Sequence, residues 1–524
     1  MTSREVTARA ATTRSPSGHG LSQLRVVRVT ECYRSAHCPI VIGWVGVLLR
    51  LAWYAERRPL WLDEAMLARR IIAVPVATLV SAPLGDAQVA PLGFLALERM
   101  AVVILGPGEL ALRAVPMLAA VASVFLFLLV ARRTVSRRVL PMAMALFSVN
   151  RALVGYAGEA KQYSTDVAVA LALWALWLVV RKPGTPQGTS WGRALVVGVA
   201  GAVAVWLSQP AVLVLGGLLG ATLVLDGNVA RRRMAAAAVV WGTSGAVAAW
   251  VAWHRVAVPD RHYLHAFWSA GFPTAGLGGV VWPVTAPAAA LGSLMRAPPG
   301  VVWLLLGLVG LWFARRELLL GVGPVLATLG AAAVGLYPFA DRLVLFLVPV
   351  ALLLVATTLD TALSHGRVGL VLAACVLVPQ LVLSLRPMPH EDMRTLVRAI
   401  VAERQVGDAI YVYYGGVPAF GYYASRAQTD VLYDAGGCHR DDGSAYLAEL
   451  DRYTGRRLWL VLGHAFGGED SLMTRYLGKV RPTLTTVTAN DAFARLYAPD
   501  TGIQDAMAHP LLAKHRAGLA CRSK

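Results

Sequence analysis

The sequence predicts an all-α polytopic membrane bundle of about eleven transmembrane helices, followed by an extracytoplasmic α/β domain at the carboxyl end. Of the 524 residues, 57% are hydrophobic and only 15% are charged, which is more apolar length than one soluble core can bury. Apolar runs of span length recur from residue 40 to residue 385, with basic clusters between them. After Arg386-Pro387 the apolar runs shrink to strand length and charged residues become more frequent.

The chain is therefore divided into three parts. Residues 1–39 are rich in Arg, Ser and Thr, and we expect a disordered cytoplasmic tail. No short apolar segment with a small-residue cleavage site precedes the first span, so we expect that span to be the targeting signal. Residues 40–385 are the predicted transmembrane domain, and residues 386–524 are the predicted extracytoplasmic domain.

Apolar runs cut at charges and at Pro or Gly breaks give the predicted spans, each about 17 to 23 residues long. Two of them are short and meet at Gln209-Pro210, which predicts a tight hairpin or a broken helix there. The predicted spans are 40–55, 109–131, 139–157, 163–180, 194–209, 211–226, 234–254, 301–314, 318–337, 343–359 and 367–385.

Basic residues predict the sidedness of these spans. They cluster after the second, fourth, sixth and eighth spans, on the same side as the Arg-rich amino-terminal tail, namely at 132–133, 137–138, 181–182, 231–233 and 315–316. Positive charge of this kind marks the cytoplasmic face. The loops 56–108, 157–162, 255–300 and 338–342 and the tail from 386 are then predicted to lie outside, with interfacial helices at 64–80 and 88–104.

The carboxyl-terminal part reads as a small α/β domain. Helices are predicted at 390–405, 417–425, 444–453 and 469–478, and strands at 409–414, 429–433, 457–462, 481–487 and 492–498. Cys438 and Cys521 both fall in this external part, which permits a disulfide between them.

The formal charge of +19 raises the question of nucleic acid as a partner. The basic residues, however, form short clusters between apolar runs, so we expect membrane lipids and no nucleic acid. The five cysteines show no CxxC pair and no zinc spacing, and we expect no metal site.

The acidic pair Asp63 and Glu64 opens the first external loop, just after the first span. A carboxylate pair at the outer mouth of a membrane protein suits a general base and its helper acting on a lipid-borne substrate. The alternative is that one carboxylate caps an interfacial helix while the other faces solvent.

Two further external turns carry polar residues at the ends of apolar helices. The first holds Glu159, Lys161 and Tyr163, which either bind something polar or seal the loop through a Glu159 to Lys161 ion pair. The second, Tyr-Pro-Phe-Ala-Asp-Arg at 337–342, ends in Arg342, whose guanidinium matches phosphate oxygens. The alternatives for Arg342 are contact with lipid headgroups or pairing with Asp341.

The external loop 255–300 is rich in aromatic and basic residues. His262 and His265 have a spacing that can ligate a metal, but no further ligand is evident. We expect this loop to anchor the chain at the membrane interface. The Gly-Gly pairs at 415–416, 436–437 and 467–468 are neither a dinucleotide fingerprint nor a P-loop.

Taken together, these loops resemble the GT-C superfamily of integral membrane glycosyltransferases, in particular the family 39-like group with protein O-mannosyltransferases and aminoarabinose transferases. The resemblance rests on Trp-Leu-Asp-Glu-Ala after the first span, Glu-Ala-Lys-Gln-Tyr-Ser after the third and Tyr-Pro-Phe-Ala-Asp-Arg before a late span, and it covers residues 40–385. It implies transfer of a sugar from a polyprenyl-phosphate donor to an envelope glycan, lipid or protein on the outer face of the cell membrane. Some members can use a divalent metal, for which this chain shows no clear ligand set.

By that resemblance Asp63 is the catalytic carboxylate. It would accept a proton from an acceptor hydroxyl that attacks the anomeric carbon, and inversion would follow because the phosphate leaves from the opposite face. Lys161 and Arg342 would stabilise the departing phosphate, and Glu64 and Glu159 would orient the sugar or tune Asp63.

Two other functions compete with this one. A transporter or flippase of a lipid-linked precursor would also place charges in the membrane, but it should show polar residues at mid-membrane depth in both halves of the chain. A sensor or assembly protein would depend on its external α/β domain and would tolerate loss of the acidic loop.

Overall fold

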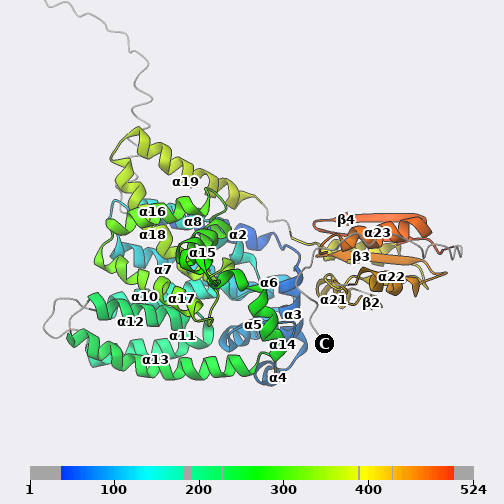
Figure 1. The fold of residues 1–524 in the computed structure, drawn as a ribbon, viewed down its shortest axis with the longest axis horizontal. Helices are drawn as coiled ribbons and strands as arrows, with labels where there is room; N and C mark the ends of the chain where they lie inside the picture. The colour runs from blue at the N-terminus through cyan, green and yellow to red at the C-terminus, as the bar shows by residue number, and fades with distance from the viewer. Residues whose placement is uncertain are drawn as a thin grey trace, which may run out of the picture.

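The computed structural model consists of a large helical bundle and a small α/β domain at one end of it (Figure 1). The structure describes residues 37–181, 190–225, 228–386, 390–427, 429–440 and 442–500. Most of the predicted tail 1–39 and the residue Cys521 lie outside these ranges. The predicted fold class is confirmed.

Within the described residues, eight helices are long and apolar enough to cross a membrane. They are α2 (Cys38–Ala55), α7 (Ala114–Thr134), α10 (Tyr163–Val180), α13 (Asn228–His254), α15 (Leu277–Met295), α17 (Arg316–Ala333), the 3₁₀ turn η3 (Asp341–Leu347) continued by α18 (Val348–Leu363), and α19 (Arg367–Leu385). Together with shorter helices they enclose an apolar core, in which the α10 side chain Trp177 is fully buried.

Four shorter apolar helices complete the bundle: α8 (Leu140–Val149), α11 (Trp191–Leu207), α12 (Ala211–Leu225) and α16 (Gly300–Trp312). An apolar helix of the described chain therefore underlies each of the eleven predicted spans. The predicted span 139–157 breaks at Asn150, whose side chain accepts a hydrogen bond from the Leu153 amide and caps α9 (Arg151–Gly155).

Helix α15 corrects the prediction that 255–300 is only a loop. Before the helix, the Gly271 carbonyl accepts a hydrogen bond from the Phe339 amide, and at its last residue the Met295 carbonyl accepts one from the Gln380 side chain of α19. In Figure 1 it is seen nearly end-on, across the direction of its neighbours. The helix was missed because Pro283 and Pro287 interrupt its sequence pattern.

Contacts group the loops at two ends of the bundle. At one end, side chains of the loops 56–108, 157–162 and 338–342 meet around Asp63. At the other end lie the basic clusters, where Arg138 pairs with Asp360 and Arg315 donates to the Val135 carbonyl. The predicted grouping is therefore present, and the assignment of the basic end to the cytoplasm stays a prediction.

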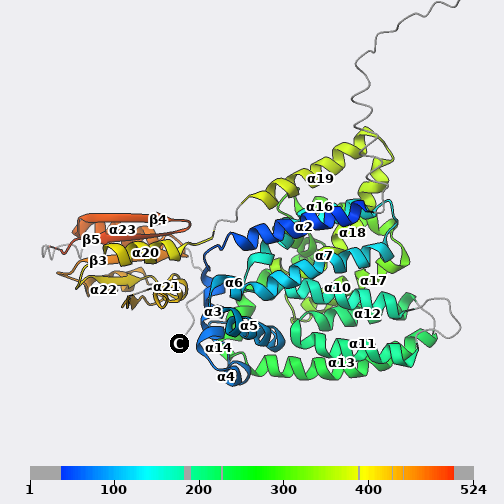
Figure 2. The ribbon, with the colours of Figure 1, turned by 180° about the vertical axis from the view of Figure 1, so that it is seen from behind.

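Short helices cover the end of the bundle nearest the α/β domain (Figure 2). They are α3 (Leu62–Ala73), α4 (Val76–Ser81), α5 (Leu92–Leu105), α6 (Glu109–Leu112), the 3₁₀ turn η1 (Tyr156–Gly158), α14 (Val258–Phe267) and the 3₁₀ turn η2 (Ser269–Gly271). Buried Leu67 on α3 and Phe94 on α5 belong to a second apolar core, which continues into the α/β domain.

The α/β domain is a five-stranded sheet with the order β2-β1-β3-β5-β4. The strands are β1 (Ala409–Val412), β2 (Asp434–Ala435), β3 (Leu458–Gly463), β4 (Thr483–Ala489) and β5 (Ala492–Tyr497). Strands β2, β1 and β3 run parallel, whereas β5 pairs antiparallel with both β3 and β4. The predicted strand 429–433 is absent, and the short edge strand begins one residue later.

Helices cover both faces of this sheet. Alternate residues of the central strands, such as Trp459 and Leu460, face α20 (Met393–Glu403) and α21 (Val417–Ala424) on one side, and α22 (Gly443–Asp451) and α23 (Glu469–Val480) on the other. Cys438 is disulfide-bonded. Its predicted partner, Cys521, lies outside the described residues.

Polar contacts fix the domain to the loop layer. Glu109 accepts hydrogen bonds from Arg394 and from the Tyr423 hydroxyl, at 3.0 and 2.7 Å, and that hydroxyl accepts one from the Leu60 amide at 2.7 Å. Leu60 lies three residues before Asp63. The sheet domain therefore helps to hold the segment that leads into the acidic pair.

Candidate active site

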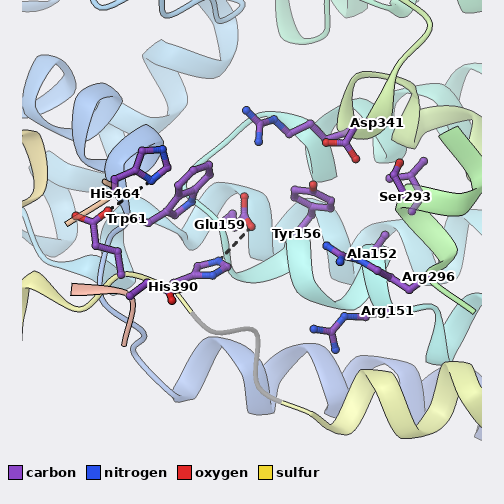
Figure 3. A pocket seen from close by; sticks show the side chains of 14 residues that line it. Trp61, Arg151, Ala152, Tyr156, Glu159, Ser293, Arg296, Asp341, His390 and His464 are labelled. Atoms are coloured by element: carbon purple, nitrogen blue, oxygen red, sulfur yellow. Dashed lines mark ion pairs between the residues drawn. The ribbon is translucent and has the colours of Figure 1, made fainter. Parts of the chain in front are cut away.

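A cavity of about 340 Å³ lies between the bundle and the α/β domain. Figure 3 shows that its walls carry both acidic and basic side chains. The residues that line it are Trp61, Arg151, Ala152, Tyr156, Glu159, Ser293, Leu294, Arg296, Asp341, Arg342, His390, Glu391, His464 and Asp491. Chain segments more than 400 residues apart thus meet in one pocket.

Asp63 lies beside this cavity, in the first turn of α3, where the helix dipole favours a negative charge. Its Oδ2 is 2.8 Å from a guanidinium nitrogen of Arg342, and its Oδ1 is 3.9 Å from Nζ of Lys161. Gln88 donates a hydrogen bond to Oδ1 at 3.2 Å and accepts one from Lys161 through its own side-chain oxygen. The structure therefore brings three of the predicted site residues together.

The surroundings of Asp63 keep it ionised. Burial by itself raises the pKa of the carboxyl, but the Lys161 ammonium, the Arg342 guanidinium and the Gln88 hydrogen bond together hold this pKa below its usual range. Burial lowers the pKa of Lys161, and the Asp63 carboxylate opposes that effect. A carboxylate that is charged near neutral pH is the form that can accept a proton.

Glu64, the next residue, points elsewhere. It is 0% exposed, it forms a two-pronged ion pair with Arg113 at 2.7 and 2.9 Å, and it accepts a hydrogen bond from the Ala160 amide at 2.7 Å. Burial opposes its ionisation, but Arg113 lowers the pKa below its usual range. Glu64 is not among the cavity-lining residues, and its contacts position the turn that carries Glu159 and Lys161.

Glu159 lines the cavity, whereas Lys161 and Tyr163 are not among the lining residues. One Glu159 oxygen is 3.5 Å from Nε2 of His390, and the other has no hydrogen-bond partner. Among the described residues no ion pair joins Glu159 to Lys161. The loop-sealing alternative is therefore not what the geometry shows.

Arg342 links the cavity to Asp63. Its guanidinium carbon lies 5.5 to 5.7 Å from the ring centroids of three aromatic residues: Trp61, Tyr163 and Trp268. Cation–π contacts of this kind hold an arginine in place. The acidic partner of Arg342 is Asp63 rather than Asp341. Trp268, from the segment 255–300, is one of the three aromatic residues around the guanidinium.

Sequence reasoning missed most of the remaining lining residues as site residues. Arg151 and Arg296 enter from helix ends of the bundle, and in the described chain neither forms an ion pair with an acidic residue. His390, Glu391, His464 and Asp491 come from the α/β domain and its linker. The sequence gives only a weak signal for these four, because each is an isolated polar residue. No sequence pattern predicts that this part of the chain packs over the bundle.

The metal alternative finds no support in the described ranges, where no group of three or more His, Cys, Asp or Glu residues is arranged to hold a metal ion. His265 instead stacks on Phe272, with ring centroids 4.7 Å apart.

No family model and no curated protein matches this sequence. Its structure is similar to that of ArnT from Cupriavidus metallidurans bound to undecaprenyl phosphate, with 13% identity, a TM-score of 0.52 and coverage of 88% of this chain and 98% of ArnT. It is also similar to the archaeal oligosaccharyltransferase AglB from Archaeoglobus fulgidus in complex with an inhibitory peptide and a dolichol-phosphate. There the identity is 10%, the TM-score 0.51 and the coverage 88% and 74%. The chain thus shares its fold with these two proteins over most of its length.

Proposed function

We propose that this chain, with its GT-C fold, is a membrane glycosyltransferase that moves a sugar from a polyprenyl-phosphate donor to a hydroxyl-bearing acceptor. The observation that carries the proposal is the Asp63 carboxylate, held by Arg342 and Lys161 beside a cavity lined by charged side chains at one end of an apolar bundle. The two similar structures contain undecaprenyl phosphate and a dolichol-phosphate, which supports a lipid phosphate as the donor class.

Asp63 acts as the general base in this proposal. Its carboxylate takes the proton of the acceptor hydroxyl, whose oxygen forms a bond to the anomeric carbon of the sugar. The bond between that carbon and the phosphate oxygen breaks, and the phosphate leaves with the electron pair from the opposite face. The configuration at the anomeric carbon is therefore inverted.

The departing phosphate needs positive charge near it. Arg342 and Lys161 share Asp63, whereas Arg151 and Arg296 line the cavity without acidic partners in the described chain. Both arginines come from the bundle, and Arg151 also donates to the Leu383 and Arg386 backbone carbonyls. We therefore assign the phosphate to Arg151 and Arg296, with Arg342 stabilising the charge that develops as the bond breaks.

The test is binding of undecaprenyl phosphate to the full-length protein in nanodiscs. We expect the double variant R151A/R296A to bind at least about tenfold more weakly than wild type, since each guanidinium contributes a charge-assisted contact. Arg132→Ala, an exposed arginine at the opposite end of the bundle, is the matched control. Equal affinity of the double variant and wild type would remove the phosphate assignment.

A second test concerns the transporter alternative. A glycosyltransferase consumes the sugar lipid chemically, whereas a flippase moves it intact between leaflets. Radiolabelled sugar lipid should therefore lose its label to an acceptor fraction of isolated envelope in the presence of wild-type protein. Label that changes leaflet but stays on the lipid would favour the transporter.

A further inference from the structure

The carboxyl end of strand β3 in the α/β domain lies at the cavity. Parallel sheets bind ligands outside the carboxyl ends of their strands. Strand β3 ends at Gly463, and the next residue, His464, lines the cavity with the Asp491 turn that joins β4 to β5. His464 has a φ of 53°, in the left-handed region, which aims its ring out of the strand line. The domain thus supplies a wall of the pocket.

Glu391 is the unusual group in that wall. The residue is 4% exposed, lines the cavity, and has no hydrogen-bond partner for either carboxyl oxygen. Nδ1 of His464 lies 3.8 Å from one of them. A buried carboxyl without partners costs free energy, which a ligand in the cavity can offset by hydrogen bonding to it.

The protonation state of Glu391 indicates what kind of ligand fits. Burial raises the pKa of this carboxyl to about 8, with the negative charge of Asp491 adding to the effect. A neutral carboxyl has one donor and an acceptor, as a hydroxyl group has, and it does not attract cations strongly. An ionised phosphate offers only acceptors and prefers the arginines of the opposite wall.

The cavity therefore has two chemically different walls. The bundle wall holds Arg151 and Arg296, and the domain wall holds Glu391 and His464. Figure 3 shows the Trp61 ring between His464 and Glu159, where it offers an apolar face. A sugar is joined directly to its phosphate, so a phosphate at the arginines places the sugar against Trp61 and the domain wall.

We infer that Glu391 binds a hydroxyl group of the sugar carried on the donor lipid, so that the α/β domain selects the donor sugar. This inference rests on the proposed function. Glu391 is a binding residue for the sugar and takes no part in proton transfer, which stays with Asp63.

The experiment compares three probe lipids in nanodiscs at neutral pH: undecaprenyl phosphate alone and the same lipid carrying glucose or arabinose. We expect wild type to bind at least one sugar lipid about tenfold more tightly than undecaprenyl phosphate. Glu391→Leu should abolish this preference and leave the affinity for undecaprenyl phosphate unchanged. Glu391→Gln, which keeps a donor and an acceptor, should retain most of it.

Two controls keep a folding defect apart from a binding defect. Glu403→Leu changes an exposed glutamate at the end of α20, outside the cavity, and should leave all affinities unchanged. Glu391→Leu should melt at a higher temperature than wild type without lipid, because it removes an unpartnered buried carboxyl. The melting temperature thereby identifies a variant that fails to fold. If Glu391→Leu fails to fold, retention of the preference for the sugar lipid by Glu391→Gln supports the inference, and its loss contradicts it.

Three outcomes overturn the inference. In the first, Glu391→Leu keeps the wild-type preference for the sugar lipid. In the second, Glu391→Leu weakens the binding of undecaprenyl phosphate as much as it weakens the binding of the sugar lipid. In the third, wild type binds undecaprenyl phosphate but shows no preference for either sugar lipid. Failure of wild type to bind undecaprenyl phosphate at all would instead remove the proposed function, and the inference with it.

Discussion

On the bundle side of the site, Asp63 and Glu64 each have a cationic partner, whereas on the domain side Glu391 has no hydrogen-bond partner. All three carboxyls are largely buried, so burial raises the pKa of each of them. Neighbouring guanidinium and ammonium groups reverse that effect for Asp63 and Glu64. Glu391 lacks such a neighbour, and burial raises its pKa to about 8.

The difference separates three roles that look alike in sequence. Asp63 is ionised and next to the cavity, which suits proton acceptance. Glu64 is ionised but enclosed, which suits holding Arg113 and the Ala160 amide in place. Glu391 is neutral and faces the cavity, which suits hydrogen bonding to an uncharged ligand group. Each role predicts a different response to substitution.

The largest effect should come from Asp63→Asn. The substitution keeps the side-chain shape and removes its basicity, so turnover should fall by about two or more orders of magnitude. The affinity for undecaprenyl phosphate should change little. Transfer rates in purified membranes measure the first quantity and nanodisc binding the second, and near-normal transfer would remove Asp63 from the role of base.

Glu64→Ala should act on stability rather than chemistry. It leaves the Arg113 guanidinium buried without its acidic partner, which typically costs about 3 to 5 kcal/mol. Thermal unfolding in detergent should show the loss, and the double variant E64L/R113M should recover a large part of it. If Glu64→Ala melts like wild type but loses turnover, Glu64 takes a direct part in catalysis.

Arg342 and Lys161 should show a coupled effect. Arg342→Lys keeps the charge but loses the planar two-pronged geometry, and Arg342→Ala loses both, so donor binding or turnover should fall further in the second variant, by roughly tenfold or more. In the double variant with Arg342→Ala, Lys161→Ala should reduce donor binding or turnover by less than it does alone, because both cations contact Asp63. Fully additive losses would mean that the two side chains act on different groups.

Stability should also depend on pH through Glu391. The unfolded Glu391 carboxyl ionises near pH 4.5, whereas the folded one holds its proton to about pH 8, so the folded state binds the extra proton between these values. Stability of wild type relative to Glu391→Leu should therefore fall as the pH rises from 5 to 8, by a few kcal/mol, at about 1.4 kcal/mol per pH unit.

Melting temperatures of the two proteins at several pH values measure this difference. His464 and Asp491, the titratable groups beside Glu391, are present in both proteins, so their own titration largely cancels. A difference that does not change with pH would show that Glu391 is already ionised in the folded protein.

Most of the fold could be predicted because it depends on local pattern. The period and length of the apolar runs identify eleven helices of the bundle, and the shorter alternating runs identify four of the five strands. The exceptions have local causes. Helix α15 contains two prolines, and β2 is only two residues long, at the edge of the sheet.

The sequence by itself determined which polar residues stand at the ends of apolar helices, because charge is costly inside a bilayer and so marks the loops. Only the tertiary structure decided which of them meet. Asp63 and Glu64 are adjacent in the chain but lie on different sides of α3, so one pairs with Arg342 across 279 residues and the other with Arg113. Glu391 acquired its place because the α/β domain packs over the bundle, and such packing depends on long-range contacts that no local pattern encodes.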